Sequence, residues 1–327
     1  MIWQPTNFRT ILLCLIVALA GCRRGEEGEL KLAYVMAPGG PAHEAAQKFA
    51  ELVQTKTDGE LTVRLFPSAQ LGNDRELVEG LGIGSIDLVV GGPAPIGWYI
   101  PQYGAIEAPF AFDSYDHLDR VLAGDVGKEM EAALLDAKNI RILSYWHRGP
   151  RFLTTTDRKI TTPADLAGLK LRVPELKTYM EAWSILGANV TPITYSEMFL
   201  ALKQGIVEGQ ENPLEVISTS SLYEVQKYVM ETEHLLSFYM LMINDQLLTS
   251  LTPNLQTAIR EAATEAGLIE HDLMVKYDQQ YKQQLRDAGM EFVPVDREAF
   301  RGTVVEELPK RFEGEWADGL LERIHGQ

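Results

Sequence analysis

Cysteine is almost absent from this chain of 327 residues, whose two cysteines are Cys14 and Cys22. Because both lie near the start, the body of the chain cannot form disulfides, thiolate zinc sites or cysteine nucleophiles. Enzyme motifs are also missing, since no G-x-S-x-G, H-E-x-x-H or G-x-x-x-x-G-K-[ST] pattern occurs. The 6 histidines show no metal-ligand spacing. We therefore expect no catalytic residues, no metal and no cofactor.

Positive charge is scarce as well. The chain has 30 Lys and Arg residues against 46 Asp and Glu residues, a formal net charge of -16. Such a surface repels phosphate backbones and anionic lipid headgroups. The composition therefore argues against nucleic-acid binding.

Long hydrophobic runs are limited to residues 11–20, which are too few to span a bilayer as a helix. This run follows Arg9 and is typical of the apolar region of a secretory signal peptide. The next residues, Leu19-Ala20-Gly21-Cys22, resemble the bacterial lipobox, after which the cysteine becomes a diacylglycerol-modified N-terminus. We predict a lipoprotein signal peptide over 1–21, a lipidated tether over 22–28, and a periplasmic protein anchored to a membrane through Cys22.

From Glu29 onward, short apolar strands alternate with amphipathic helices, and the length of the chain suggests two domains. The β-α-β-α-β order predicts a mostly parallel sheet covered by helices on both faces. A second series of this kind begins near Ile140. The first series comprises strands at 31–36, 61–66 and 86–90 and helices at 41–55 and 74–82.

The two series repeat one another. Each has a strand ending in proline, a helix, a glycine stop and a strand with one acid. A helical glutamate precedes the glycine by the same spacing in both copies, Glu76 before Gly84 and Glu197 before Gly205. The repeat favours two similar α/β lobes, which we assign to residues 29–147 with 237–277 and to residues 148–236 with 278–327.

One predicted helix is longer than a lobe. Helix-forming sequence runs from Pro253 to about Ala288, roughly 50 Å at 1.5 Å per residue. Gly267 is its only break, and Gly289 is the expected stop. We infer a helix that crosses between the lobes, with two helices kinked at Gly267 as the alternative.

Arg172 is the most informative charged residue. In the segment 168–175, Leu169, Leu171 and Val173 alternate with polar residues, so Arg172 points to the opposite strand face. A solvated face is one interpretation. If helices cover both faces, however, the arginine needs an anionic partner, and a carboxylate held by both ends of the guanidinium fits that need.

The sequence resembles the solute-binding subunits of tripartite ATP-independent periplasmic (TRAP) transporters from about Leu30 to the C-terminal helix. The motifs that carry the resemblance are Phe66-Pro-Ser-Ala-Gln-Leu-Gly-Asn-Asp-Arg-Glu76, Ser85-Ile-Asp87, Pro163-Ala-Asp-Leu-Ala-Gly-Leu-Lys-Leu-Arg-Val-Pro174, Tyr195-Ser196-Glu197 and Val207-Glu-Gly-Gln-Glu-Asn-Pro213. The resemblance implies an α/β, two-lobed periplasmic-binding-protein-like fold with a hinge and a long lobe-crossing helix. It also implies a monomer that captures an organic acid and delivers it to a TRAP membrane permease.

The resemblance assigns carboxylate-binding roles to residues of the second lobe. Arg172 is expected to clamp the carboxylate, Arg151 to be a second arginine beside it, and Asn212 to donate an amide hydrogen bond. Tyr195 is expected to form an aromatic wall.

We expect the first lobe to contribute residues near His43, Asn73 and Trp98. A C4-dicarboxylate would need a further cation, which Arg148 could supply, whereas aromatic side chains suit a sugar acid such as a hexuronate. Both ligand classes stay open. The rival hypothesis is an exported enzyme, a lyase or hydrolase acting on a sugar acid.

Overall fold

The computed structural model describes residues 28–327. The predicted signal peptide, Cys22 and the tether up to residue 27 lie outside this range. Within residues 28–327, none of the helices combines the length and apolar character needed to cross a membrane.

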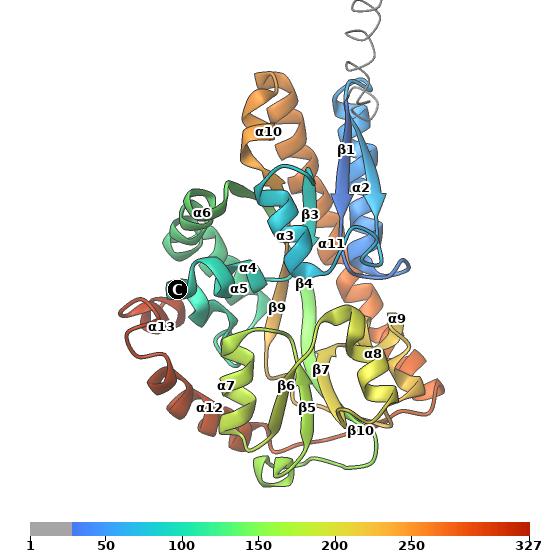
Figure 1. Cartoon of the computed structure of the whole chain (residues 1–327), viewed down its shortest axis with the longest axis vertical. Coiled ribbons are helices and arrows are strands. Elements are labelled where there is room, and N and C mark those ends of the chain that lie inside the picture. Colours follow the sequence, from blue (N-terminus) through green and yellow to red (C-terminus); the bar gives the residue numbers. More distant parts are fainter. Residues whose placement is uncertain (1–27) are drawn as a thin grey trace, which may run out of the picture.

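The upper part of the molecule in Figure 1 contains the first predicted series. Strand β1 pairs in parallel with β2 and β3, and the sheet continues through β9 and β4 in the order β2-β1-β3-β9-β4. The elements of the series are β1 (Glu29–Ala33), α2 (Pro41–Lys56), β2 (Thr62–Phe66), α3 (Asp74–Gly82) and β3 (Leu88–Gly91). The predicted β-α-β-α-β order is confirmed.

The lower part contains the second series. Strand β5 pairs in parallel with β6 and β7, as the repeat predicts. Two short strands, β8 and β10, pair in parallel beside β4. The elements are β5 (Lys170–Val173), α7 (Lys177–Ile185), β6 (Asn189–Pro192), α8 (Tyr195–Lys203), β7 (Gly209–Pro213), α9 (Leu214–Thr219), β8 (Tyr228–Met230) and β10 (Glu291–Val293).

Two antiparallel strands pass between the parts, β4 (Ile140–Thr155) and β9 (Leu236–Asn244) (Figure 1). Their pairing shifts register between His147 and Pro150. Gly149, which lies in this irregularity, has φ +76°, a conformation that L side chains rarely adopt. The chain therefore changes direction here without leaving the sheet.

The long helix is continuous. Helix α11 (Pro253–Asp287) has 35 residues and packs on α2 in the upper part and on α9 in the lower part. Gly267 does not interrupt it. A Cβ at Gly267 would lie 3.4 Å from Cδ1 of Trp146, so the glycine allows close approach to β4. Gly289 has φ +92° and follows the end of the helix, which confirms the predicted stop.

The C-terminal helices divide between the parts. Helix α12 (Arg297–Arg311) packs on α7 below. Helix α13 (Leu320–His325) packs instead on α6 (Asp125–Lys138) and the 3-10 helix η1 (Pro101–Glu107) above, where Arg323 pairs with Glu129 at 2.8 Å. The end of the chain therefore lies on the upper part, whereas the proposed boundary placed 278–327 below.

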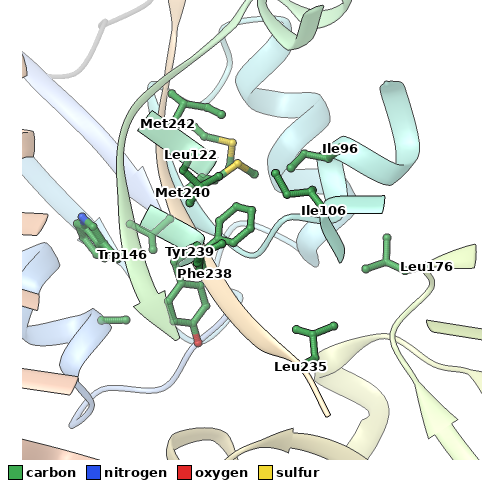
Figure 2. Packing of buried hydrophobic residues seen from close by; sticks show 14 of the residues in the cluster. Ile96, Ile106, Leu122, Trp146, Leu176, Leu235, Phe238, Tyr239, Met240 and Met242 are labelled. Atoms are coloured by element: carbon green, nitrogen blue, oxygen red, sulfur yellow. The ribbon is translucent and has the colours of Figure 1, made fainter. Parts of the chain in front are cut away.

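The core is shared. Figure 2 shows Phe238, Tyr239 and Met240 of β9 packed among buried side chains, with Leu176 from the lower part nearby. All four side chains are buried. The remaining helices are α4 (Ala94–Tyr99), α5 (Tyr115–Ala123), α10 (Asp245–Ser250), and the 3-10 helices η2 (Pro163–Leu166) and η3 (Leu222–Glu224).

Candidate functional site

A pocket lies between the two parts, where the carboxyl ends of parallel strands from both sheets meet, the usual place for ligands in open α/β sheets. It contains about 730 Å³ of space, part of it open to solvent. The lining residues that follow or end strands are Val35 and Met36 after β1, Gly92 after β3, Pro174 and Glu175 after β5, Ile193, Thr194 and Tyr195 after β6, and Asn212 in β7.

Arg172 lies in the pocket wall. Its residue is only 2% exposed, and its Nε donates to the Ile193 carbonyl at 2.9 Å. Its two terminal nitrogens donate no hydrogen bond to any group in residues 28–327. Burial lowers the pKa of Arg172 to about 10, so the guanidinium remains charged at neutral pH. This arginine therefore offers a bidentate donor pair to an anion.

Arg148 is a second cation in the same wall. Its Cζ lies 4.8 Å from the ring centroid of Tyr239, and its Nε is buried without a hydrogen-bond partner in the described chain. A Cβ at Gly92 would lie 2.8 Å from Arg148 Nη1, so this glycine leaves room for the guanidinium. Arg148 and Arg172 together make this side of the pocket positive.

Arg151 occupies a different place from the one expected. It is fully buried behind the lining residues and pairs with Glu211, with Nη2 donating to Oε1 at 2.7 Å. The same Nη2 donates to Asn212 Oδ1 at 3.1 Å. Burial raises the pKa of Glu211, but the pairing with Arg151 and His234 outweighs this effect and lowers it to about 2. Arg151 thus fixes the amide of Asn212 from behind.

Tyr195 and Asn212 both line the pocket. Tyr195 lies at the start of α8, and its hydroxyl is 2.7 Å from Ser220 Oγ. Asn212 lies in β7, and its Nδ2 donates to Gln210 Oε1 at 2.5 Å. Both side chains are held in place by neighbours.

The upper part contributes the start of α3. Asn73 caps this helix, accepting from the Glu76 amide at 3.1 Å. Asp74, the next residue, lines the pocket and was not predicted from the sequence. Burial raises its pKa, although Arg148 and Arg172 oppose this effect. Asp74 therefore places a carboxyl group within electrostatic reach of both pocket arginines.

Trp98 connects the two parts across the pocket. Its Nε1 donates to the backbone carbonyl of Glu175 at 3.0 Å. The guanidinium of Arg75 lies 4.3 Å from the Trp98 ring. These contacts hold α4 of the upper part against the loop after β5.

Of the predicted residues, His43 and Arg151 do not line the pocket, whereas the other six do. His43 Nδ1 lies 2.7 Å from the hydroxyl of Tyr34. The charged and aromatic lining residues that the sequence did not single out are Asp74, Arg75, Glu175, Tyr179 and Tyr239. Asp74 and Arg75 lie within the motif that begins at Phe66, which is the one signal that could have indicated them.

Comparison with known proteins gives consistent similarities. Residues 32–315 match the model of bacterial extracellular solute-binding protein, family 7. A TRAP periplasmic solute-binding protein from Roseobacter denitrificans, solved with bound L-galactonate, superposes with a TM-score of 0.86. It is 33% identical, and the match covers 93% of this chain and 99% of that one.

Two curated relatives bind different acids. The 2,3-diketo-L-gulonate-binding periplasmic protein YiaO of Escherichia coli is 32% identical over 272 residues, 83% of each chain. The C4-dicarboxylate-binding periplasmic protein DctP of Rhodobacter capsulatus is 30% identical over 278 residues, 84% of this chain and 82% of the relative.

Proposed function

The chain belongs to family 7 of the bacterial extracellular solute-binding proteins, and on this premise we propose that its ligand is a polyhydroxy monocarboxylate, a sugar acid. Proteins of this family are TRAP solute-binding proteins of the periplasm that bind sugar acids or C4-dicarboxylates and are not enzymes. The rival hypothesis of a lyase or hydrolase is therefore set aside. The choice between the two ligand classes rests on the pocket.

The charge of the pocket lining carries the proposal. The lining includes three arginines and two acids, Asp74 and Glu175, so its net charge is a single positive one. One ligand carboxylate balances that charge. A second carboxylate would lie in the same pocket as Asp74, where like charges repel and desolvation adds to the cost. Hydroxyl groups, in contrast, can donate to the Asp74 carboxylate.

The contacts of the wall suggest a role for each residue. Arg172 holds the carboxylate through its free terminal nitrogens, and Arg148 adds positive charge. Asn212 donates to the carboxylate in place of the contact of its Nδ2 with Met198 Sδ. Tyr195 packs against the carbon chain. Arg151 is a positioning residue, because it binds Asn212 and Glu211 rather than the pocket.

Asn73 and Trp98 complete the proposed site from the first lobe. Asn73 caps the helix that carries Asp74, and Trp98 donates to the loop after β5. His43 does not line the pocket, and its ring centroid lies 5.9 Å from that of Tyr34.

We propose a first lobe of 29–147 with 237–277 and a second of 148–236 with 278–327, except that α13 belongs with the first lobe, on which it packs. The lobes would move about β4, β9 and α11. Because the pocket is lined from both lobes, ligand contacts favour the closed arrangement. The closed monomer then presents its ligand to a TRAP permease. The Leu19-to-Cys22 motif supports a lipid anchor that keeps the protein at the membrane.

A thermal-shift screen of the mature chain tests the ligand class. We expect aldonates or hexuronates to raise the melting temperature, because a ligand at 100 times its Kd adds about 2.7 kcal/mol of stability. Neutral sugars and succinate should give no shift. Asp74→Asn removes the repulsion while keeping the helix start, and it should weaken sugar-acid binding and improve dicarboxylate binding. A wild-type protein that prefers succinate over every sugar acid would overturn the proposal.

A further inference from the structure

A cluster of two histidines and one aspartate lies outside the ligand pocket. Asp119 of α5, His147 of β4 and His271 of α11 each offer a ligand atom, and these atoms lie within 4.8 Å of one another. His147 Nε2 is 2.9 Å from Asp119 Oδ1. Because the three residues lie in separate elements, no local sequence motif identifies them.

The His271 imidazole has a nitrogen that is available to a metal ion. Nε2 of the same ring is buried, yet it has no hydrogen-bond partner among residues 28–327. A buried imidazole nitrogen without a hydrogen-bond partner is available as a ligand atom for a metal ion.

Two further carboxyl groups, those of Glu270 and Glu131, lie near the cluster. His147 is 8% exposed, and its backbone amide donates to Glu270 Oε2 at 2.8 Å. Asp119 also lines a solvent-open cavity with Glu131 and Tyr145. This acidic cavity gives an ion from solvent a path to the two histidines.

The ring geometry shows what binding requires. The His147 and His271 rings lie 3.7 Å apart at 11°, so their lone pairs run side by side. Two nitrogens on a tetrahedral Zn²⁺ lie about 3.4 Å apart, given Zn–N bonds of about 2.1 Å. One ring must therefore turn about its Cβ–Cγ bond until both lone pairs converge. The His147 ring is also stacked on Tyr115, with ring centroids 4.1 Å apart, and its Nε2 is paired with Asp119. The His271 ring is therefore the one expected to turn.

We propose that Asp119, His147 and His271 form a binding site for a divalent transition metal ion such as Zn²⁺, with water in the remaining position. Two imidazoles and one carboxylate suit Zn²⁺ better than Ca²⁺ or Mg²⁺, which prefer oxygen ligands. The ion would join α5, β4 and α11 at the point where β4 leaves the first sheet. His147 also precedes Arg148, so the site adjoins the ligand pocket without sharing its lining residues.

Binding of Zn²⁺ and Co²⁺ to the untagged mature protein tests the proposal. We expect one equivalent of Zn²⁺ by calorimetry, a higher melting temperature with Zn²⁺, and the visible absorption of tetrahedral Co²⁺. His271→Gln and Asp119→Asn should each weaken Zn²⁺ binding at least about tenfold. The control His325→Gln changes an exposed histidine at the chain end and should bind like wild type.

Melting without metal shows whether each variant folds. Asp119, whose side chain is 44% exposed, supplies the variant least able to disturb the core. The proposal is overturned if folded wild-type protein lacks the Co²⁺ absorption, or if Asp119→Asn and folded His271→Gln bind Zn²⁺ with wild-type affinity. Equal stabilisation by Ca²⁺ would instead indicate ordinary binding to surface acids and would also overturn it.

Discussion

Replacing Arg172 should abolish ligand binding while leaving the protein folded. The side chain is almost fully buried in the pocket wall, and within residues 28–327 its Nε alone donates a hydrogen bond, to the Ile193 carbonyl. Loss of one partner of a buried charge pair typically costs about 2–5 kcal/mol, or roughly thirtyfold to several thousandfold in affinity. Arg172→Ala should therefore bind the best sugar acid roughly several thousandfold more weakly than wild type, or below detection.

Arg172→Lys separates charge from geometry. Lysine keeps the positive charge but cannot hold a carboxylate with two parallel N–H groups. We expect binding at least about tenfold weaker than wild type. The control is Arg158→Ala, because Arg158 is exposed and donates to the carbonyls of Asp165 and Ala167 outside the pocket.

Calorimetry with one sugar acid on the three variants gives the comparison, and circular dichroism confirms that each is folded. Arg172→Ala with wild-type affinity would show that the carboxylate is held elsewhere. Equal losses in Arg158→Ala would show that the effect is general destabilisation.

Three further predictions concern stability and kinetics. Burial raises the pKa of Glu107 from 4.5 to about 8, despite Arg148 and Arg151, so the folded state retains a proton that the unfolded state loses. The free energy of unfolding should therefore fall as pH rises from about 5 to about 8. In urea unfolding, the stability of Glu107→Gln relative to wild type should increase across that range, whereas parallel curves would contradict the assignment. A Cβ at Gly127 would lie 1.9 Å from the Leu122 carbonyl oxygen, so Gly127→Ala should lower the free energy of unfolding by about 2 kcal/mol or more. Gly302 on α12 faces open space, so Gly302→Ala should raise the free energy of unfolding by about 0.5–1 kcal/mol. Thermal melts that rank the two variants in the opposite order would refute this. The net charge of -16 repels an anionic ligand, so the association rate measured by stopped flow should rise modestly with added salt. A rate that falls with salt would contradict this, because it would require positive charge around the pocket entrance that attracts the ligand.

Local sequence patterns were sufficient for the repeated α/β units and for α11. Period-two alternation put Arg172 on the strand face opposite Leu171 and Val173, and glycine stops marked helix ends. The passage of β4 between the sheets was not predictable, because Gly149-Pro150 resembles a break. The strand continues there because β9 and β7 pair with it on either side of the irregularity.

The site was predicted less completely than the fold. Arg151 and Glu211 are 60 residues apart, and only the β4–β7 register brings them together. Sequence alone could not show that this pair turns Arg151 away from the pocket. Asp74 was overlooked for a related reason, since an acid at a helix start is ordinary until the opposite wall is known.

The contact between Trp98 and Glu175 has a consequence for how ligand preference can change. The tryptophan donates to the backbone carbonyl, not to the carboxylate of residue 175. The side chain at this position is exposed and lines the pocket. A substitution at position 175 changes the side chain that faces the ligand but retains the hydrogen bond across the pocket. Position 175 is thus a place where selection or design can retune the chemistry of the cavity independently of the contact that joins its two walls.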